Sequence, residues 1–195
     1  MSLLVILFNS IFVQNIVLTQ FLGICAFLGV SADTKSARGM GYAVVFVLLI
    51  SSAITWPIFH FVLLPYKLDF IRTVVFALVI AAVVQMVEII MKKSIPSLHE
   101  SLGIYLPLIT TNCAILGIAI TNVESEYNFI EAIVNAFGTG IGFFIAIVLF
   151  SVLRKTMMSA PIPQTFKGLP AALVAAAIMS LAFVGFSGVA ENLFI

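Results

Sequence analysis

Long apolar runs alternate with short polar connections along the whole chain. The pattern predicts six membrane-spanning helices, at roughly residues 3–29, 40–62, 71–91, 102–121, 129–152 and 170–190. These runs have about the length that a helix needs to cross a hydrocarbon layer ~30 Å thick. Lipid also favours helices because every backbone polar group must be satisfied within the segment. We therefore expect an all-α polytopic membrane protein with a single transmembrane domain over residues 1–195.

The composition agrees with a membrane location. Hydrophobic residues make up 63% of the chain and charged residues only 9%, whereas soluble domains carry about 25% charged residues. The short connections leave no room for a soluble catalytic domain, so a nucleotide or flavin would have to be bound by another chain. The net charge of +1 gives no reason to expect a nucleic-acid partner.

The basic residues are distributed unevenly between the two sides. Seven of the nine are expected in the loops after spans one, three and five, and only Lys67 and Arg72 on the other side. Because cytoplasmic loops carry an excess of Lys and Arg, this bias predicts that those three loops are cytoplasmic and both termini outside. The seven residues are Lys35, Arg38, Lys92, Lys93, Arg154, Lys155 and Lys167.

The only two cysteines, Cys25 and Cys113, lie in matching frames. The segments LTQFLGICAFLGV (18–30) and LPLITTNCAILGI (106–118) share the pattern C-A-(F/I)-L-G at an offset of 88 residues. That offset contains three predicted spans, so the second copy enters the membrane from the opposite side. The spacing predicts two inverted three-helix repeats, roughly 1–92 and 100–195, an architecture that many transport proteins share.

The first helix of each repeat is expected to be broken near the membrane midplane. Pro107 interrupts the second cysteine segment, and Thr110, Thr111 and Asn112 offer side chains to freed backbone groups. The first segment carries polar residues up to Gln20 and then Gly23. A half-helix that begins at a cysteine would direct its positive end toward a thiolate.

The paired cysteines have three interpretations. A single free cysteine in a membrane helix is most often a small buried hydrophobe. A Cys25–Cys113 disulfide is possible but disfavoured. Paired thiolates at a symmetry axis would instead be soft ligands for zinc, copper or an iron–sulfur cluster. Zinc and [2Fe–2S] clusters take four ligands, so two would come from another chain, since no His is close to either cysteine in the sequence.

Four stretches carry a resemblance to a known family. They are FLGICAFLGVS (21–31), RTVVFALVIAAVVQMVE (72–88), LGIYLPLITTNCAILG (102–117) and FKGLPAALVAAAIMSLAFVGFSG (166–188). Across essentially its whole length, the chain resembles the A-subunit family of the Rnf complex. It is more distantly similar to the E-type component of the sodium-pumping NADH:quinone reductase.

The resemblance implies a membrane subunit of an ion-translocating ferredoxin:NAD⁺ oxidoreductase, which would not be catalytic alone. In that family two homologous six-helix subunits of opposite orientation hold one [2Fe–2S] cluster between them. The resemblance places this chain's half of the ligands at Cys25 and Cys113. It also implies an E-type partner, further subunits with flavins, iron–sulfur clusters and the NAD site, and the inner (cytoplasmic) membrane of a prokaryote.

Two other polar residues are candidates for ion handling. Glu88 lies inside a predicted span, yet Lys92 stands one turn later and a helix-end ion pair is the simpler interpretation. His60 is expected at the outer membrane surface. A secondary transporter is the alternative function, because carriers also use inverted repeats with broken helices. The two thiols separate these functions, since a carrier has no need of them.

Overall fold

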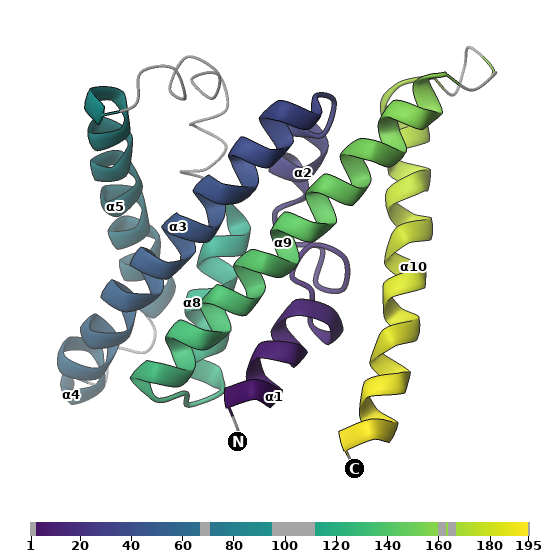
Figure 1. Ribbon diagram of the computed structural model, residues 1–195. Helices are drawn as coiled ribbons and strands as arrows, with labels where there is room; N and C mark the ends of the chain where they lie inside the picture. Colours follow the sequence, from purple (N-terminus) through teal and green to yellow (C-terminus); the bar gives the residue numbers. More distant parts are fainter. Residues whose placement is uncertain (1–2, 67–70, 95–111, 160–162, 164–166, 195) are drawn as a thin grey trace.

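The computed structural model describes residues 3–66, 71–94, 112–159, 163 and 167–194, and every element in these ranges is helical (Figure 1). The first half contains α1 (Leu3–Phe8), the π-helical turn η1 (Asn9–Val13), α2 (Ile24–Val30), α3 (Thr34–Ile58), a second π-helical turn η2 (Phe59–Leu63), α4 (Leu64–Tyr66) and α5 (Arg72–Ser94). The second half contains α8 (Cys113–Glu124), α9 (Phe129–Met158) and α10 (Leu169–Phe194).

Three helical stretches in the described ranges are long and apolar enough to cross a membrane. They are Thr34–Leu63, Arg72–Ile89 and Phe129–Met158, and they match the predicted spans 40–62, 71–91 and 129–152. The helix α10 covers the predicted span 170–190. In the predicted span 3–29, residues 14–23 are not helical. In the span 102–121, residues 102–111 lie outside the described residues and α8 covers the rest.

The helices extend beyond the apolar runs and take up charged residues that the sequence assigned to loops. Lys35 and Arg38 lie in the first turns of α3, and Lys93 and Arg154 lie near the ends of α5 and α9. At the start of α3, the Asp33 carboxylate caps the helix by accepting from the Ser36 N–H at 3.0 Å and the Ser36 hydroxyl at 2.8 Å. The hydrogen bonds from Ser36 lower the pKa of Asp33 below its ordinary value. Local capping, which hydropathy does not register, sets this boundary.

The helices α3 and α9 form the centre of the structure and run side by side in opposite directions (Figure 1). Small residues allow this close packing. A Cβ atom on Gly140 of α9 would lie 3.1 Å from the Val45 Cα of α3. Lipid provides no hydrophobic driving force between helices, so close van der Waals packing of this kind holds membrane helices together.

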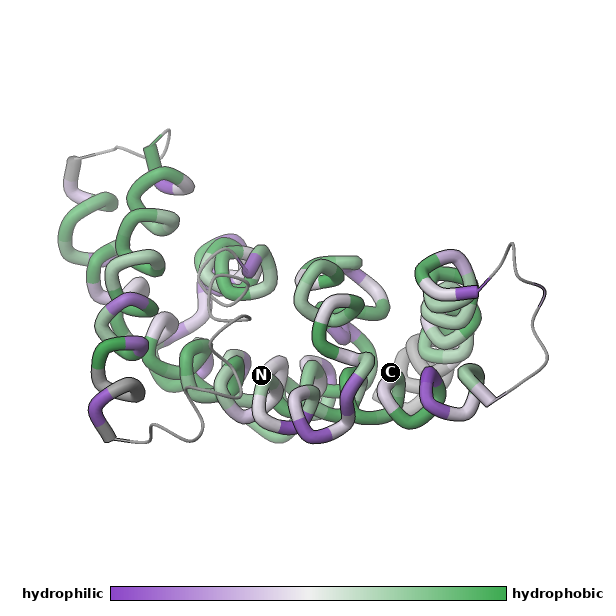
Figure 2. Tube along the Cα trace, turned by 90° about the horizontal axis from the view of Figure 1, so that it is seen from above, coloured by the Kyte–Doolittle hydropathy of each residue, from purple (hydrophilic) through white to green (hydrophobic). Residues whose placement is uncertain are grey.

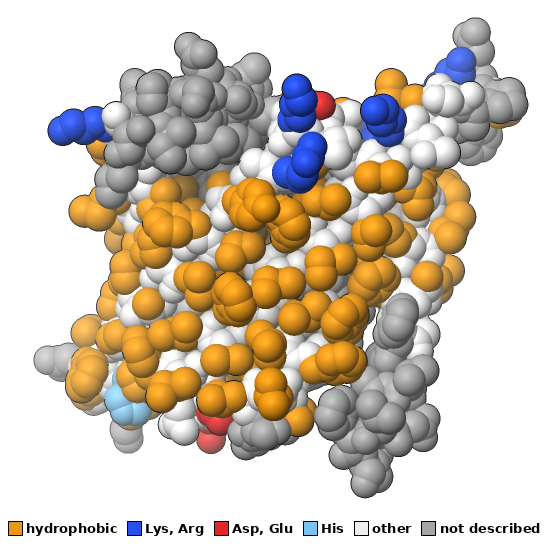
Figure 3. Space-filling view, in the orientation of Figure 1, with side chains coloured by type: hydrophobic (Ala, Val, Ile, Leu, Met, Phe, Trp, Pro, Cys, Tyr) orange, Lys and Arg blue, Asp and Glu red, His pale blue; other side chains and the backbone are white. Residues whose placement is uncertain are grey.

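Hydrophobic residues dominate the described helices, as the hydropathy colouring shows (Figure 2). On the face shown in Figure 3, Lys and Arg side chains gather at the end where α9 finishes. The His side chain and further acidic side chains appear at the opposite end, which is also where the two termini lie (Figures 1 and 3). An ion pair at this second end joins Arg72 to Glu124 at 3.3 Å. The structure therefore has one basic end, separated from the termini by an apolar middle.

Candidate functional site: two thiols at an interrupted helix

Ten residues without α-helical structure, 14–23, separate η1 from α2. Asn15, which is 1% exposed, provides partners for the backbone freed at this interruption. Its side-chain nitrogen donates to the Gly142 carbonyl at 3.0 Å, and its side-chain oxygen accepts from the Val17 and Leu18 N–H groups at 3.2 and 3.3 Å. One amide thus fixes the loop to α9 and satisfies backbone groups that lipid could not.

The chain turns at the end of this loop through two residues with left-handed backbone. Phe21 has φ 57° and Gly23 has φ 81°. Gly23 also lies in a crowded position, because an added Cβ would be 3.1 Å from the Asn112 Oδ1 and 3.2 Å from the Ala114 Cβ. Both the positive φ and the lack of space require glycine here.

The interruption brings the two cysteine segments into contact. Cys113 is the first residue of α8 and is half-buried, and Cys25 lies in the first turn of α2 and is exposed. Both thiols are free. The Gly23 N–H donates to the Cys113 Sγ, with a nitrogen–sulfur distance of 2.8 Å. A residue two positions before one cysteine therefore contacts the other cysteine, 90 positions further along the chain.

Asn112 caps the start of α8 beside this contact. Its Oδ1 accepts from the Ala114 N–H at 3.1 Å, and its backbone carbonyl accepts from the Ile115 N–H at 3.1 Å. Asn112 is 3% exposed, yet its Nδ2 has no hydrogen-bond partner in the part of the chain that the structure describes. The sequence indicates that Asn112 satisfies freed backbone, and its Oδ1 does so. Thr110, Thr111 and Pro107 lie outside the described residues.

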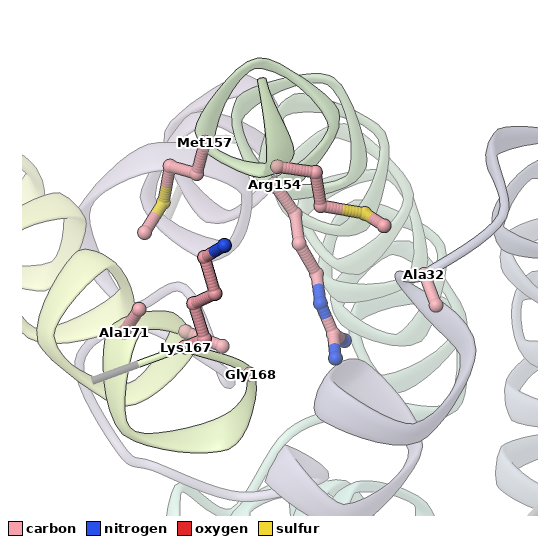
Figure 4. Close-up of a pocket in the computed structure, with 8 residues that line it drawn as sticks. Ala32, Arg154, Met157, Lys167, Gly168 and Ala171 are labelled. Atoms are coloured by element: carbon pink, nitrogen blue, oxygen red, sulfur yellow. The ribbon is translucent and has the colours of Figure 1, made fainter. Parts of the chain in front are cut away.

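Arg154 of α9 holds the other end of the short helix α2. Its Nη1 donates to the Leu28 carbonyl at 2.7 Å and lies 3.0 Å from the Ser31 Oγ. A cation at a helix C-terminus is stabilising because the free carbonyl groups there carry partial negative charge. Arg154 also lines a cavity of about 300 Å³, into which Met157 of α9 and Lys167 project (Figure 4).

The outcomes for the predicted residues differ. Cys25 is exposed in this chain and Cys113 is half-buried, and neither thiol forms a disulfide. Glu88 is half-buried in α5, and the side chain of Lys92 lies outside the described residues. His60 stacks on Trp56 with ring centroids 5.0 Å apart. Within the described ranges, no group of three or more His, Cys, Asp and Glu residues is placed to hold a metal ion.

Sequence reasoning missed the supporting residues around the thiols. The sequence presents Arg154 only as a marker of orientation, and Asn15 only as one polar residue near a helix break. Asn15 donates to the Gly142 carbonyl, 127 positions later in the chain, and also accepts from N–H groups of the irregular segment. Arg154 donates to the Leu28 carbonyl, 126 positions earlier. The positions of Asn15 and Arg154 within otherwise helical, apolar stretches are the available signal, but their partners cannot be read from it.

The long apolar helices together define an all-helical membrane protein that crosses the bilayer more than once. Residues 3–190 match the family model described as Rnf-Nqr subunit, membrane protein, and the chain belongs to this family. It is 52% identical over 188 residues to the A-type subunit of the Na⁺-translocating ferredoxin:NAD⁺ oxidoreductase complex of Acetobacterium woodii, covering 96% of this chain and 98% of that one.

Two further relatives show that the similarity extends over the whole chain. The A-type subunit of the ion-translocating oxidoreductase complex of Syntrophotalea carbinolica is 50% identical over 187 residues, with 96% and 97% of the two chains covered. Its counterpart in the proton-translocating ferredoxin:NAD⁺ oxidoreductase complex of Clostridium ljungdahlii is 46% identical over 187 residues, with the same coverage. The family resemblance expected from the four sequence stretches is confirmed.

Proposed function

We propose that this chain carries electrons across the bilayer as a membrane subunit of an ion-translocating ferredoxin:NAD⁺ oxidoreductase. It would do so through a [2Fe–2S] cluster shared with a homologous subunit. Membership of the family and the names of its relatives support the complex. The observation that carries the cluster is the contact between the two cysteine segments, through the Gly23 N–H and the Cys113 Sγ.

The residues around the thiols fit such a cluster. The two free thiols are soft ligands for iron. They make up half of the four ligands that a [2Fe–2S] cluster takes. A cluster with four thiolates is an anion, and an anion in a low-dielectric region requires donors or positive charge. The start of α8 offers partial positive charge at Cys113 itself. The cluster would supply a one-electron carrier inside the membrane.

The directions of the helices support two inverted repeats with a broken first helix in each. From their cysteines, α2 and α8 run toward opposite ends of the molecule, and α3 runs against α9 (Figure 1). In this arrangement the interruption at residues 14–23 lies between the two ends. A carrier at that depth divides a hydrocarbon layer of ~30 Å into two shorter gaps, and short gaps are what electron tunnelling requires.

Exposure around Cys25 supports a homologous E-type partner. Cys25 is exposed and Phe21 is 58% exposed, so this chain alone leaves the first thiol uncovered. A partner subunit with its own two thiols would complete the ligand set and cover this surface. The remaining subunits of the complex would hold the flavins, the other iron–sulfur clusters and the NAD site.

The distribution of charge supports an orientation in a prokaryotic inner membrane. Lys and Arg gather at one end of the face shown in Figure 3, and both termini lie at the other. Cytoplasmic loops of membrane proteins carry an excess of Lys and Arg, so the basic end would lie in the cytoplasm and the termini outside.

The proposal is tested by Cys25→Ser and Cys113→Ser in the complete, co-expressed complex. Serine keeps the size and polarity of cysteine but is a poor ligand for iron. We expect each variant to lose one [2Fe–2S] electron paramagnetic resonance signal and ferredoxin-to-NAD⁺ turnover. The signals of flavins and of the remaining clusters should persist, which controls for assembly. Two assembled variants that keep every signal and turn over normally would refute the proposal.

The same variants address the alternative, a secondary transporter of inverted-repeat architecture. The opposed helix directions are equally compatible with it. A carrier would keep its transport activity in both serine variants, because serine preserves packing and no thiol is needed. Ion transport that continues without electron transfer in these variants would favour the transporter.

A further inference from the structure

Within the described ranges, the Asn112 side chain has one hydrogen-bonding atom without a partner. Its Oδ1 is occupied by the Ala114 N–H at 3.1 Å, whereas Nδ2 has no acceptor among the described residues although Asn112 is only 3% exposed. A buried donor without an acceptor costs about 1–3 kcal/mol, and each such group in a native structure calls for an explanation. The alternative amide orientation would not help, because the nitrogen would then face another donor, the Ala114 N–H.

The surroundings of Asn112 indicate which acceptor is missing. The residue is covalently next to Cys113 and caps the first turn of α8, a helix of 12 residues. Its amide lies against Gly23, since a Cβ atom there would be 3.1 Å from Oδ1, and the Gly23 N–H donates to the Cys113 Sγ. Asn112 and the Cys113 sulfur therefore contact the same residue. The acceptor that the proposed function would bring beside Asn112 is a sulfur of a cluster held at Cys113.

We infer that Asn112 is a positioning residue whose Nδ2 donates to a sulfur of the bound [2Fe–2S] cluster and raises its reduction potential. The inference rests on the proposed function. Reduction adds negative charge to the cluster, and a hydrogen-bond donor stabilises the more negative state. Hydrogen bonds to the sulfurs are among the means by which proteins set the potential of such clusters.

Asn112→Ser isolates the donor from the helix cap. Serine is as good an N-cap as asparagine and keeps an oxygen for the Ala114 N–H, but it lacks the second polar atom. We expect a reduction equilibrium about tenfold less favourable, which for one electron is a potential about 59 mV lower. Asn112→Asp keeps the cap and places a negative charge there instead, so its potential should be lower still.

Asn128→Ser is the matched control. Asn128 is also a helix N-cap, at the start of α9, and its side chain takes part in a capping box with Glu131. The same substitution there changes a cap away from the thiols, so the potential should not move. A general loss of stability would affect both variants, whereas loss of a donor to sulfur affects only Asn112→Ser.

The measurement is a redox titration of the purified complex, followed by electron paramagnetic resonance of the signal that Cys113→Ser removes. A lower potential in Asn112→Ser, with Asn128→Ser unchanged, supports the inference. If Asn112→Ser does not assemble, Asn112→Thr provides the same comparison, because threonine also keeps a capping oxygen and lacks the second polar atom. An unchanged potential in the assembled variant refutes the role of Asn112 and leaves the proposed function intact. Absence of the signal from the wild-type complex overturns both.

Discussion

At the scale of single residues, Gly23 determines whether the two cysteine segments can meet. Its φ of 81° is one that residues with a side chain rarely adopt, and its N–H is the donor to the Cys113 Sγ. The neighbouring Asn112, Ala114 and Phe143 leave 3.1–3.3 Å for any added Cβ. A change here therefore acts on backbone conformation and on packing at the same time.

Gly23→Ala should lower the thermal stability of the complex and weaken retention of the proposed cluster. The positive φ costs alanine about 1–2 kcal/mol, and the crowded neighbours add to this. Gly168→Ala is the control, because Gly168 also has a positive φ, 93°, but no atom of the described residues lies within 4 Å of an added Cβ. Scanning fluorimetry and iron content of both purified variants provide the comparison. Equal effects of the two changes would show that crowding at Gly23 is unimportant.

At the scale of elements, the contact between α3 and α9 depends on small residues and on buried polar pairs. Asn135 of α9 donates to the Asn122 Oδ1 of α8 at 2.7 Å, and Asn122 donates to the Ser52 Oγ of α3 at 3.0 Å. Ser10 of η1 donates to the Asn135 Oδ1. Four elements are thus joined by one connected set of hydrogen bonds, and each member is at most 6% exposed.

Gly140→Ala tests the close approach of α3 and α9. The new methyl group would lie 3.1 Å from both the Cα and the Cγ2 of Val45, and overpacking of this kind typically costs about 1–3 kcal/mol. An added Cβ on Gly185 of α10 would meet no described atom within 4 Å, so Gly185→Ala should be neutral or stabilise by up to ~1 kcal/mol through helix propensity. The thermal midpoint of each variant in detergent gives the answer. A Gly140→Ala protein as stable as Gly185→Ala would contradict the packing argument.

The sequence predicted the elements more completely than their ends and contacts. Hydropathy located α3, α5 and α9 because their apolar runs are long, and the repeated cysteine frame singled out Cys25 and Cys113. It did not place Thr34 at the start of α3, where a local Asp33 cap decides. It also gave no partner for Arg154 or Asn15, because their acceptors are backbone carbonyl groups on distant elements. Such contacts depend on the three-dimensional packing and leave no periodic pattern.

At the scale of the whole molecule, the separation of charges predicts how the chain lies in the membrane. Ser159 follows α9, and the exposed Ser125 follows α8. These two serines mark opposite ends, because α8 finishes where α9 begins and α9 finishes at the basic end (Figure 1). The same substitution, serine to cysteine, can therefore be made at each end of the molecule.

Ser125→Cys should react with a membrane-impermeant maleimide in intact spheroplasts, and Ser159→Cys only after lysis. The reason is that, in the orientation proposed above, the excess of basic residues would put the α9 end in the cytoplasm. Labelling of the parent chain, which retains Cys25 and Cys113, gives the background. The reverse pattern would require the opposite orientation.

The long-range hydrogen bonds at the interrupted helix also have a consequence for how the chain is made. Asn15 and Leu28 are joined to Gly142 and Arg154, partners 127 and 126 residues later. At ~5–20 residues per second, synthesis of those partners takes on the order of ten seconds. During that time the first segment has only the 11-residue stretch Leu3–Val13 and the seven-residue helix α2, neither long enough to span. We therefore expect the packed, hydrogen-bonded form of this segment to be completed only after α9 has been made.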